Sequence, residues 1–168
     1  MNAPLRNPNL QAQHEAMSKL AFLIGDWTGF ARIHRPSGEI VELKQTEKVQ
    51  YKLEGLLLLI EGIGWKHLGE RPVLQALGLI SYEDADAKYQ MRAFNDGRFL
   101  ETEVKLLDDR KGLNWGFALG NVTTKSVLAI NENGEWAETH DISIDSQPSR
   151  KLMEVAVRLI APASSPEV

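Results

Sequence analysis

Three features of the chain predict a mainly β fold, namely a single closed antiparallel up-and-down β-barrel of about ten strands after one N-terminal α-helix. Apolar residues recur at helical spacing only in the segment 10–24. Beyond Gly25, turn-forming residues recur roughly every 8–17 positions and leave about ten strands. The final strand, at 151–160, is apolar on both faces apart from Glu154 and Arg158, which suits a strand that pairs back with the first one.

The 168 residues are predicted to form one domain, which is long enough to bury a hydrophobic core without disulfides. Residues 1–9, which include two prolines, are expected to form a flexible lead. The helix and the barrel are expected to occupy 10–160. The segment 161–168 is rich in proline and serine and is expected to be a disordered tail.

The composition excludes several classes of function. A net charge of −4 and the absence of any Lys/Arg run longer than two argue against nucleic-acid binding, which needs a basic surface. The chain has no cysteine, so disulfides, thiolate catalysis and Cys-ligated zinc are impossible. The longest apolar run, "LLLLI" at 56–60, is too short to cross a bilayer, and the first residues carry no apolar signal segment. A cytoplasmic protein without a membrane span is therefore expected.

Glycine and tryptophan open the first predicted strand, in the stretch "IGDWTGF" at 24–30. Gly25 is expected to end the helix. In a small barrel the first strand crosses the closed end, so Trp27 is expected to fill the floor. Gly29 lies on the same face of the strand as Trp27 and leaves room above the indole.

The clearest strand, at 40–51, is expected to bring polar groups inside the barrel. Its residues alternate, and the more apolar face is the one expected to point inward. This inward face also carries Gln45 and Glu47, so the alternation puts an amide and a carboxyl group into the interior.

The order of a helix, then Gly-Asp-Trp, then about ten strands resembles the calycin superfamily, which includes lipocalins, fatty-acid-binding proteins and nitrobindin-like barrels. A closer resemblance is to the bacterial DUF1579 family of uncharacterised proteins. The resembling segments cover most of 17–160 and read "LAFLIGDWTGFARI" at 20–33, "LEGLLLLIEG" at 53–62, "ALGLISYEDADAKYQMRAFNDG" at 76–97 and "LMEVAVRLI" at 152–160. The resemblance implies a barrel whose central cavity accepts a small, largely apolar molecule, and it implies no established reaction.

Nitrobindin-like barrels bind haem through a histidine on a late strand. The last histidine here is His140, and no similar C-terminal histidine segment follows it, so neither haem nor another cofactor is expected.

The segment at 56–67 offers a candidate wall of the cavity. Its odd positions include Glu61, Trp65 and His67, which would place a carboxylate, an indole and an imidazole in an apolar pocket. The alternative is that Glu61 points outward and the even positions pack the core, because both faces of this strand are apolar. The odd face is the one expected to point inward.

Arg92 is a candidate anchor for a ligand carboxylate, as the likeness to fatty-acid carriers suggests. It lies in a predicted hairpin that turns at Asn95-Asp96-Gly97. The favoured alternative is a cross-strand pair of Arg92 with a glutamate on the outside. Trp115 is expected to wall the pocket or to form part of the ordinary core.

The four histidines show no metal-binding spacing, so no metal site is predicted. His67 and His140 are expected to lie on strands. Glu138 and His140 share a strand face, where they could act as an acid–base pair or simply be solvated.

The function predicted from these residues is the binding of a small hydrophobic or amphipathic ligand in the barrel cavity. The candidate ligand-binding residues are Trp27, Glu61, Trp65, His67, Arg92, Trp115 and His140. One alternative is an acid–base enzyme that uses His140 with Glu138 or Glu61. Another is a filled barrel that forms a homodimer through exposed apolar residues such as Phe30.

Overall fold

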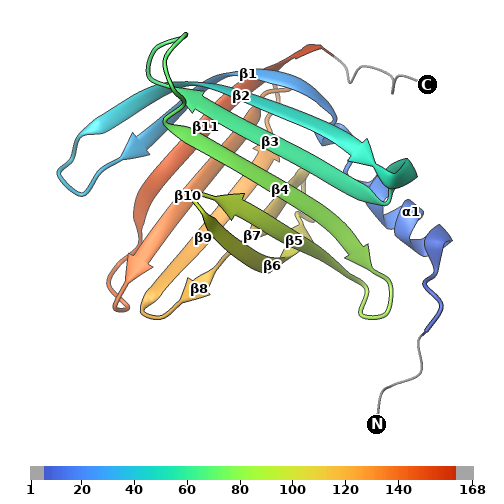
Figure 1. The fold of residues 1–168 in the computed structure, drawn as a ribbon. Coiled ribbons are helices and arrows are strands. Elements are labelled where there is room, and N and C mark those ends of the chain that lie inside the picture. Colours follow the sequence, from blue (N-terminus) through green and yellow to red (C-terminus); the bar gives the residue numbers. More distant parts are fainter. Residues whose placement is uncertain (1–5, 162–168) are drawn as a thin grey trace.

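The computed structural model describes residues 6–161 as an antiparallel barrel with one α-helix at its end (Figure 1). The helix α1 spans Leu10–Ser18, and two short 3-10 turns, η1 and η2, span Ala21–Leu23 and Leu53–Gly55. The strands in chain order are β1 (Gly25–His34), β2 (Ile40–Lys52), β3 (Leu57–Trp65), β4 (Leu74–Glu83), β5 (Lys88–Asn95), β6 (Arg98–Leu106), β7 (Gly112–Trp115), β8 (Ala118–Leu119), β9 (Val122–Ile130), β10 (Trp136–Ile144) and β11 (Arg150–Ala161). The rest of the predicted lead and tail, 1–5 and 162–168, lies outside the described residues.

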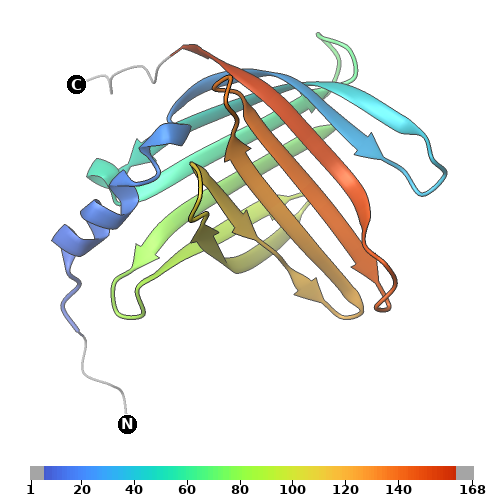
Figure 2. The same ribbon diagram turned by 180° about the vertical axis from the view of Figure 1, so that it is seen from behind.

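The strands pair with their neighbours from β1 to β7, and β9, β10 and β11 complete the ring. β9 pairs with both β7 and β10, and β11 pairs with both β10 and β1. Figure 2 shows this returning side of the barrel. Ten strands thus close the sheet, while the two-residue β8 pairs with β9 beside β7. The predicted closed barrel of about ten strands and the pairing of the last strand with the first are confirmed.

Gly29 allows the close approach of β1 and β11 where the barrel closes. It pairs with Val157, and a side chain at this position would overlap the carbonyl oxygen of Ala156. The room that the sequence predicted at Gly29 is therefore taken by the backbone of β11.

The helix is shorter than predicted. It ends at Ser18 instead of running over 10–24, because the chain tightens into 3-10 turns in which the Lys19 and Leu20 amides donate to Ala16 and Met17 three residues earlier. The hydroxyl groups of Tyr51 and Tyr89 also donate hydrogen bonds to the carbonyl oxygens of Met17 and Ala16, over 2.6 and 2.7 Å.

No helix within residues 6–161 is long and apolar enough to span a membrane.

The helical segment closes one end of the barrel (Figures 1 and 2). Met17, Leu20 and Leu23 are completely buried there. The indole of Trp27 is 3% exposed, donates to the Leu23 carbonyl over 2.9 Å, and meets Trp136 edge to face at 5.6 Å. Trp27 thus lies in the closed end, at the position predicted for the floor.

Candidate ligand-binding site

The barrel encloses a cavity of about 410 Å³ above this closed end. Its walls are mainly apolar and come from strands on all sides of the barrel. They include Ile60, Leu74, Ile80, Met91, Leu113, Trp115, Phe117, Leu128, Trp136, Leu152, Met153 and Val155. A cavity of this size and lining has the character of a small-molecule site.

The mouth of the cavity lies at the end of the barrel opposite α1. The lining residues Ile33, Leu74 and Leu152 stand at those ends of their strands that face away from the helix. The β5–β6 turn contributes Asp96 and Arg98 to the same rim. In that turn, Asp96 and Gly97 both have positive φ, as the predicted Asn-Asp-Gly hairpin requires.

A buried pair of polar side chains from β2 faces the cavity. Gln45 is 2% exposed and Glu47 is 7% exposed, and the Gln45 amide donates to Glu47 Oε1 over 2.7 Å. Gln45 Oε1 has no hydrogen-bond partner within residues 6–161. Gln45 Oε1 is therefore a buried hydrogen-bond acceptor without a donor, although buried polar atoms normally have a hydrogen-bond partner.

A second polar group faces the cavity from β9 and β10. Ser126 and His140 pair across these strands, and Ser126 Oγ lies 2.8 Å from His140 Nδ1. His140 Nε2 lies 2.8 Å from Glu138 Oε1, but the two atoms do not form a hydrogen bond. The indole of Trp136 donates to Glu138 Oε2 over 2.8 Å.

Two glycines on β3 make room for the polar pair on β2. Gly62 and Gly64 lie opposite Glu47 and Gln45 in the β2–β3 ladder. A side-chain carbon at Gly62 would come within 2.7 Å of Glu47 Oε2, and one at Gly64 within 2.7 Å of Gln45 Oε1. The sequence "EGIGW" at 61–65 thus leaves space inside the barrel for a carboxyl and an amide group.

Burial raises the pKa of Glu47 to about 8, and the negative charge of Glu138 adds to this effect, while the hydrogen bond from Gln45 opposes it. Glu47 is therefore largely protonated near neutral pH. A carboxylic acid in this state can donate a hydrogen bond as well as accept one.

Two of the predicted site residues line the cavity. These are Trp115 and His140, whose rings meet edge to face at 6.0 Å. Trp27 lies beneath the cavity, in contact with Trp136. The prediction that His140 lies on a strand is confirmed, and its position opposite Ser126 follows from the β9–β10 register.

The expected inward face of the strand at 56–67 is wrong. Leu58, Gly62 and Gly64 of the even face are buried, whereas Glu61 is exposed and Trp65 is half-buried on the outside. The physical reason is the space needed by Gln45 and Glu47, which only the glycines provide. The prediction that His67 lies on a strand is also wrong, because β3 ends at Trp65 and His67 is exposed in the following loop.

The interpretation of Arg92 as an anchor inside the cavity is wrong as well. Arg92 lies on the outer face of β5 and pairs with Glu101 of β6, with Nε and Oε2 3.5 Å apart. The alternative of an outside cross-strand pair is confirmed. Arg98, six residues later, lies instead at the mouth of the cavity.

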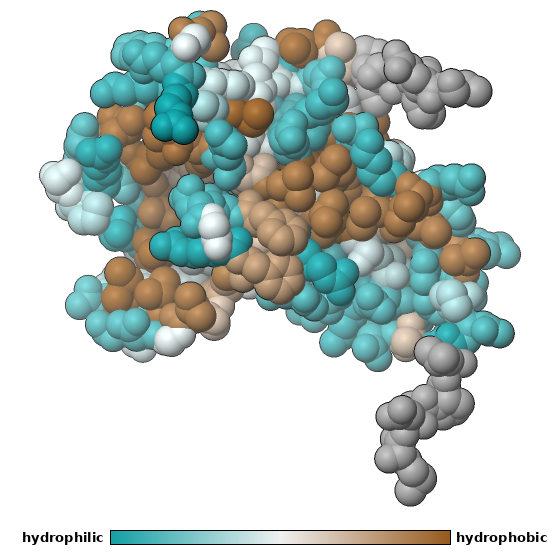
Figure 3. All heavy atoms as spheres, viewed as in Figure 1, coloured by the Kyte–Doolittle hydropathy of each residue, from teal (hydrophilic) through white to brown (hydrophobic). Residues whose placement is uncertain are grey.

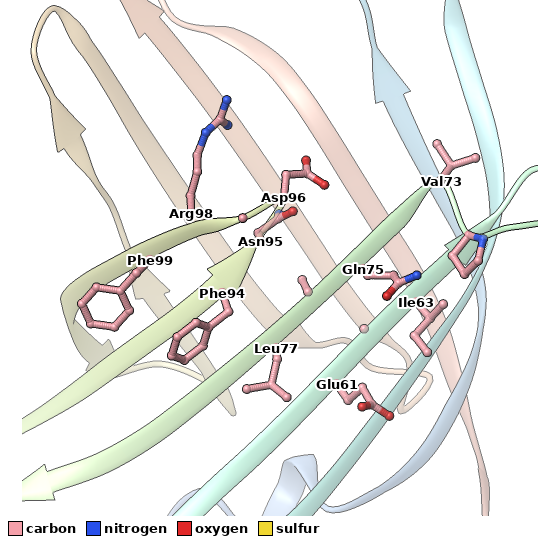
Figure 4. Close-up of a pocket in the computed structure, with 14 residues that line it drawn as sticks. Glu61, Ile63, Val73, Gln75, Leu77, Phe94, Asn95, Asp96, Arg98 and Phe99 are labelled. Atoms are coloured by element: carbon pink, nitrogen blue, oxygen red, sulfur yellow. The ribbon is translucent and has the colours of Figure 1, made fainter.

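An open groove of about 600 Å³ lies on the outside of the barrel, across β3, β4 and the β5–β6 turn. Figure 4 shows Leu77 and Phe94 in this groove, with Asp96 and Arg98 at its upper edge. Figure 3 shows apolar atoms gathered over β3 and β4 on the same side. The groove and the cavity meet along β3, β4 and the β5–β6 turn, where they share the lining residues Gly62, Ala76, Leu77, Phe94, Asn95, Asp96 and Arg98.

Within residues 6–161, no group of three or more His, Cys, Asp or Glu side chains is arranged to hold a metal ion. The polar groups that face the cavity are the Glu47 carboxyl group, the Gln45 amide and the side chains of Ser126, Glu138 and His140.

The sequence indicates part of this site. The prediction that alternation puts Gln45 and Glu47 inside the barrel is confirmed, and so is the shared face of Glu138 and His140. Ser126 could not be found in this way, because nothing in the sequence fixes which residue of β9 lies opposite His140.

Comparison with known proteins supports the fold. No family model matches the chain, and no curated protein does. Among solved structures, Rv2717c from M. tuberculosis superposes with a TM-score of 0.64 at 13% identity, over 86% of this chain and 96% of that one. The S-type phycobiliprotein lyase CPES from Guillardia theta superposes with a TM-score of 0.58 at 6% identity, over 96% of this chain and 99% of that one. At these identities the likeness shows that the chain shares the lipocalin-like barrel fold of both proteins.

Proposed function

We propose that the protein binds a small amphipathic molecule in the barrel cavity. The observation that carries this proposal is the set of buried polar groups facing an apolar space, with Gln45 Oε1 left without a partner. A protein that used the barrel only as a scaffold would fill this space with side chains. A ligand with a polar end would satisfy the free groups while its apolar part covers the walls.

The ligand would lie with its polar end toward Gln45 and Glu47 and its apolar part against the apolar walls of the cavity. Trp115 and Met153 would contact the apolar part, since both line the cavity. The outer groove that meets the cavity at Asp96 and Arg98 offers an access route. The roles of Trp27, Trp115 and His140 in binding, the DUF1579 membership and the cytoplasmic location stay predictions.

A cavity-filling variant tests the proposal. A side chain at Gly78 on β4 would meet only Met91 and Ile60 at ordinary distances of 3.7 and 3.9 Å, so Gly78→Leu fills the cavity without a backbone clash. Ser81→Leu is the matched control, because it adds a similar side chain to the outer face of the same strand. We expect the neutral dye Nile red to bind the wild type and Ser81→Leu but not Gly78→Leu. Equal dye binding by all three proteins, or by none, would contradict a cavity site.

A second candidate function is acid–base catalysis, which the 2.8 Å contact of Ser126 Oγ with His140 and the 2.8 Å contact of His140 with Glu138 favour. The imidazole of His140 can move a proton to or from a bound substrate. In that case His140→Ala would abolish turnover and leave the binding of the substrate nearly intact. Equal loss of both would indicate a role in binding alone.

The predicted homodimer also stays a prediction. Phe30 on β1 is 50% exposed, and Leu77, Phe94 and Phe99 are paired neighbours on the outer face. A purely monomeric sedimentation profile at high protein concentration would contradict it.

A further inference from the structure

The polar part of the cavity is rich in hydrogen-bond acceptors and poor in cations. Glu47 and Glu138 face it, and among the described lining residues the basic side chains are His140 and Arg98. Arg98 is exposed at the mouth, on the β5–β6 turn. A ligand carboxylate beside Glu47 would therefore face two acidic side chains, Glu47 and Glu138.

The unpartnered atom beside Glu47 is also an acceptor. Gln45 is almost completely buried, and its Oε1 has no donor within residues 6–161 while its amide nitrogen is held by Glu47. A donor on a bound ligand would satisfy this oxygen. This observation is independent of the acidic residues and points to the same kind of ligand group.

We propose that the molecule in the cavity carries a protonated amine at its polar end, with Glu47 as its counter-ion and Gln45 Oε1 as a second acceptor. An ammonium group has three donors and no acceptor, which complements these oxygens. The inference rests on the proposed function, since it names the chemical class of the ligand in the same cavity. The candidate carboxylate ligand, which depended on Arg92 inside the barrel, is thereby replaced by its electrostatic opposite.

Amine binding at Glu47 must be linked to pH. In the empty cavity the pKa of Glu47 is raised to about 8, so below this pH an ion pair forms only when the proton leaves for the solvent. The titratable groups that face Glu47 are Glu138 and His140 on β10, while its neighbours Gln45, Gly62 and Trp27 carry no charge. Amine affinity should therefore rise with pH up to about 8 and then level off, because an alkylamine itself stays protonated to roughly pH 10.

A matched series of decylamine, decanol and decanoate tests this by titration calorimetry near pH 6 and near pH 8. From the fraction of ionised Glu47, decylamine should bind roughly 50-fold more tightly near pH 8, and its binding near pH 6 should release about one proton. Decanol should show no such rise, and decanoate should bind more weakly than decanol at both pH values. In Glu47→Gln, decylamine should lose its pH dependence and about tenfold or more of its affinity near pH 8, because the charge-assisted bond is gone.

Glu61→Gln is the matched control, because it removes a carboxylate from the outer face of the barrel. It should bind all three probes as the wild type does. If decanol binds and decylamine shows neither a preference nor a pH dependence, the amine proposal is overturned while the proposed function stands. If none of the three probes binds at either pH, the proposed function fails and the amine proposal fails with it.

Discussion

The buried carboxyl group of Glu47 should make the stability of the protein fall as the pH rises. In the unfolded chain this group has its ordinary pKa of 4.5, whereas in the folded protein the pKa is about 8. Between these two values the folded state holds a proton that the unfolded state has lost. The unfolding free energy should therefore decrease by about 1.4 kcal/mol per pH unit in this window, to a total of roughly 5 kcal/mol. Below the window both states are protonated and above it both are ionised, so the contribution is constant there.

Glu47→Gln isolates this effect, because the amide has nearly the same shape and can still accept the hydrogen bond from Gln45. We expect the variant to match the wild type within about 1 kcal/mol near pH 4.5 and to be roughly 5 kcal/mol more stable above pH 8. Urea unfolding followed by tryptophan fluorescence at a series of pH values measures both curves. Glu61→Gln, whose carboxylate is exposed on the outside, should show no such divergence. A difference between wild type and Glu47→Gln that is the same at every pH would show that the folded protein does not hold Glu47 in its neutral form.

Three further predictions concern the residues around the site. Gly62→Ala places a carbon 2.7 Å from Glu47 Oε2 and should lower the unfolding free energy, measured in urea, by about 1–3 kcal/mol. In a Glu47→Ala background the clash is absent, so the same substitution should cost less. Trp27→Ala removes a buried indole that packs on Trp136 and should lower the unfolding free energy by about 3–5 kcal/mol; a loss below about 1 kcal/mol in the same measurement would exclude its place in the closed end. Arg92→Ala breaks an exposed ion pair with Glu101 and should change stability by no more than about 1 kcal/mol and leave Nile red binding unaltered, so weakened dye binding would speak for a role of Arg92 in the cavity.

The barrel could be predicted from the sequence because its signals are local and repeated. Turn residues mark the hairpins, and the strand at 40–51 alternates clearly enough to put Gln45 and Glu47 inside. The sequence predicts the wrong inward face for the strand at 56–67 because both of its faces are apolar. The inward face is decided by the space that Gly62 and Gly64 leave for the side chains of β2. This is a contact between two strands and has no signal within one of them.

The positions of Arg92 and Arg98 also depend on a contact between two strands. Both residues lie near one hairpin, but in the register of β5 and β6 Arg92 lies outside beside Glu101, whereas Arg98 lies at the mouth of the cavity. The predicted helix is too long because its apolar spacing continues through η1. There the chain tightens into a 3-10 turn and buries Leu20 and Leu23 in the closed end of the barrel. Periodicity does not distinguish an α-helix from a short helix followed by a 3-10 turn.

The claim that the cavity holds a ligand is tested most directly by native mass spectrometry of the freshly purified protein, compared with its denatured mass. The wild type should carry a reproducible extra mass that denaturation releases, and Gly78→Leu, purified in the same way, should not carry it. A ligand-free mass for the wild type, together with no uptake of Nile red, would contradict a binding function for the cavity.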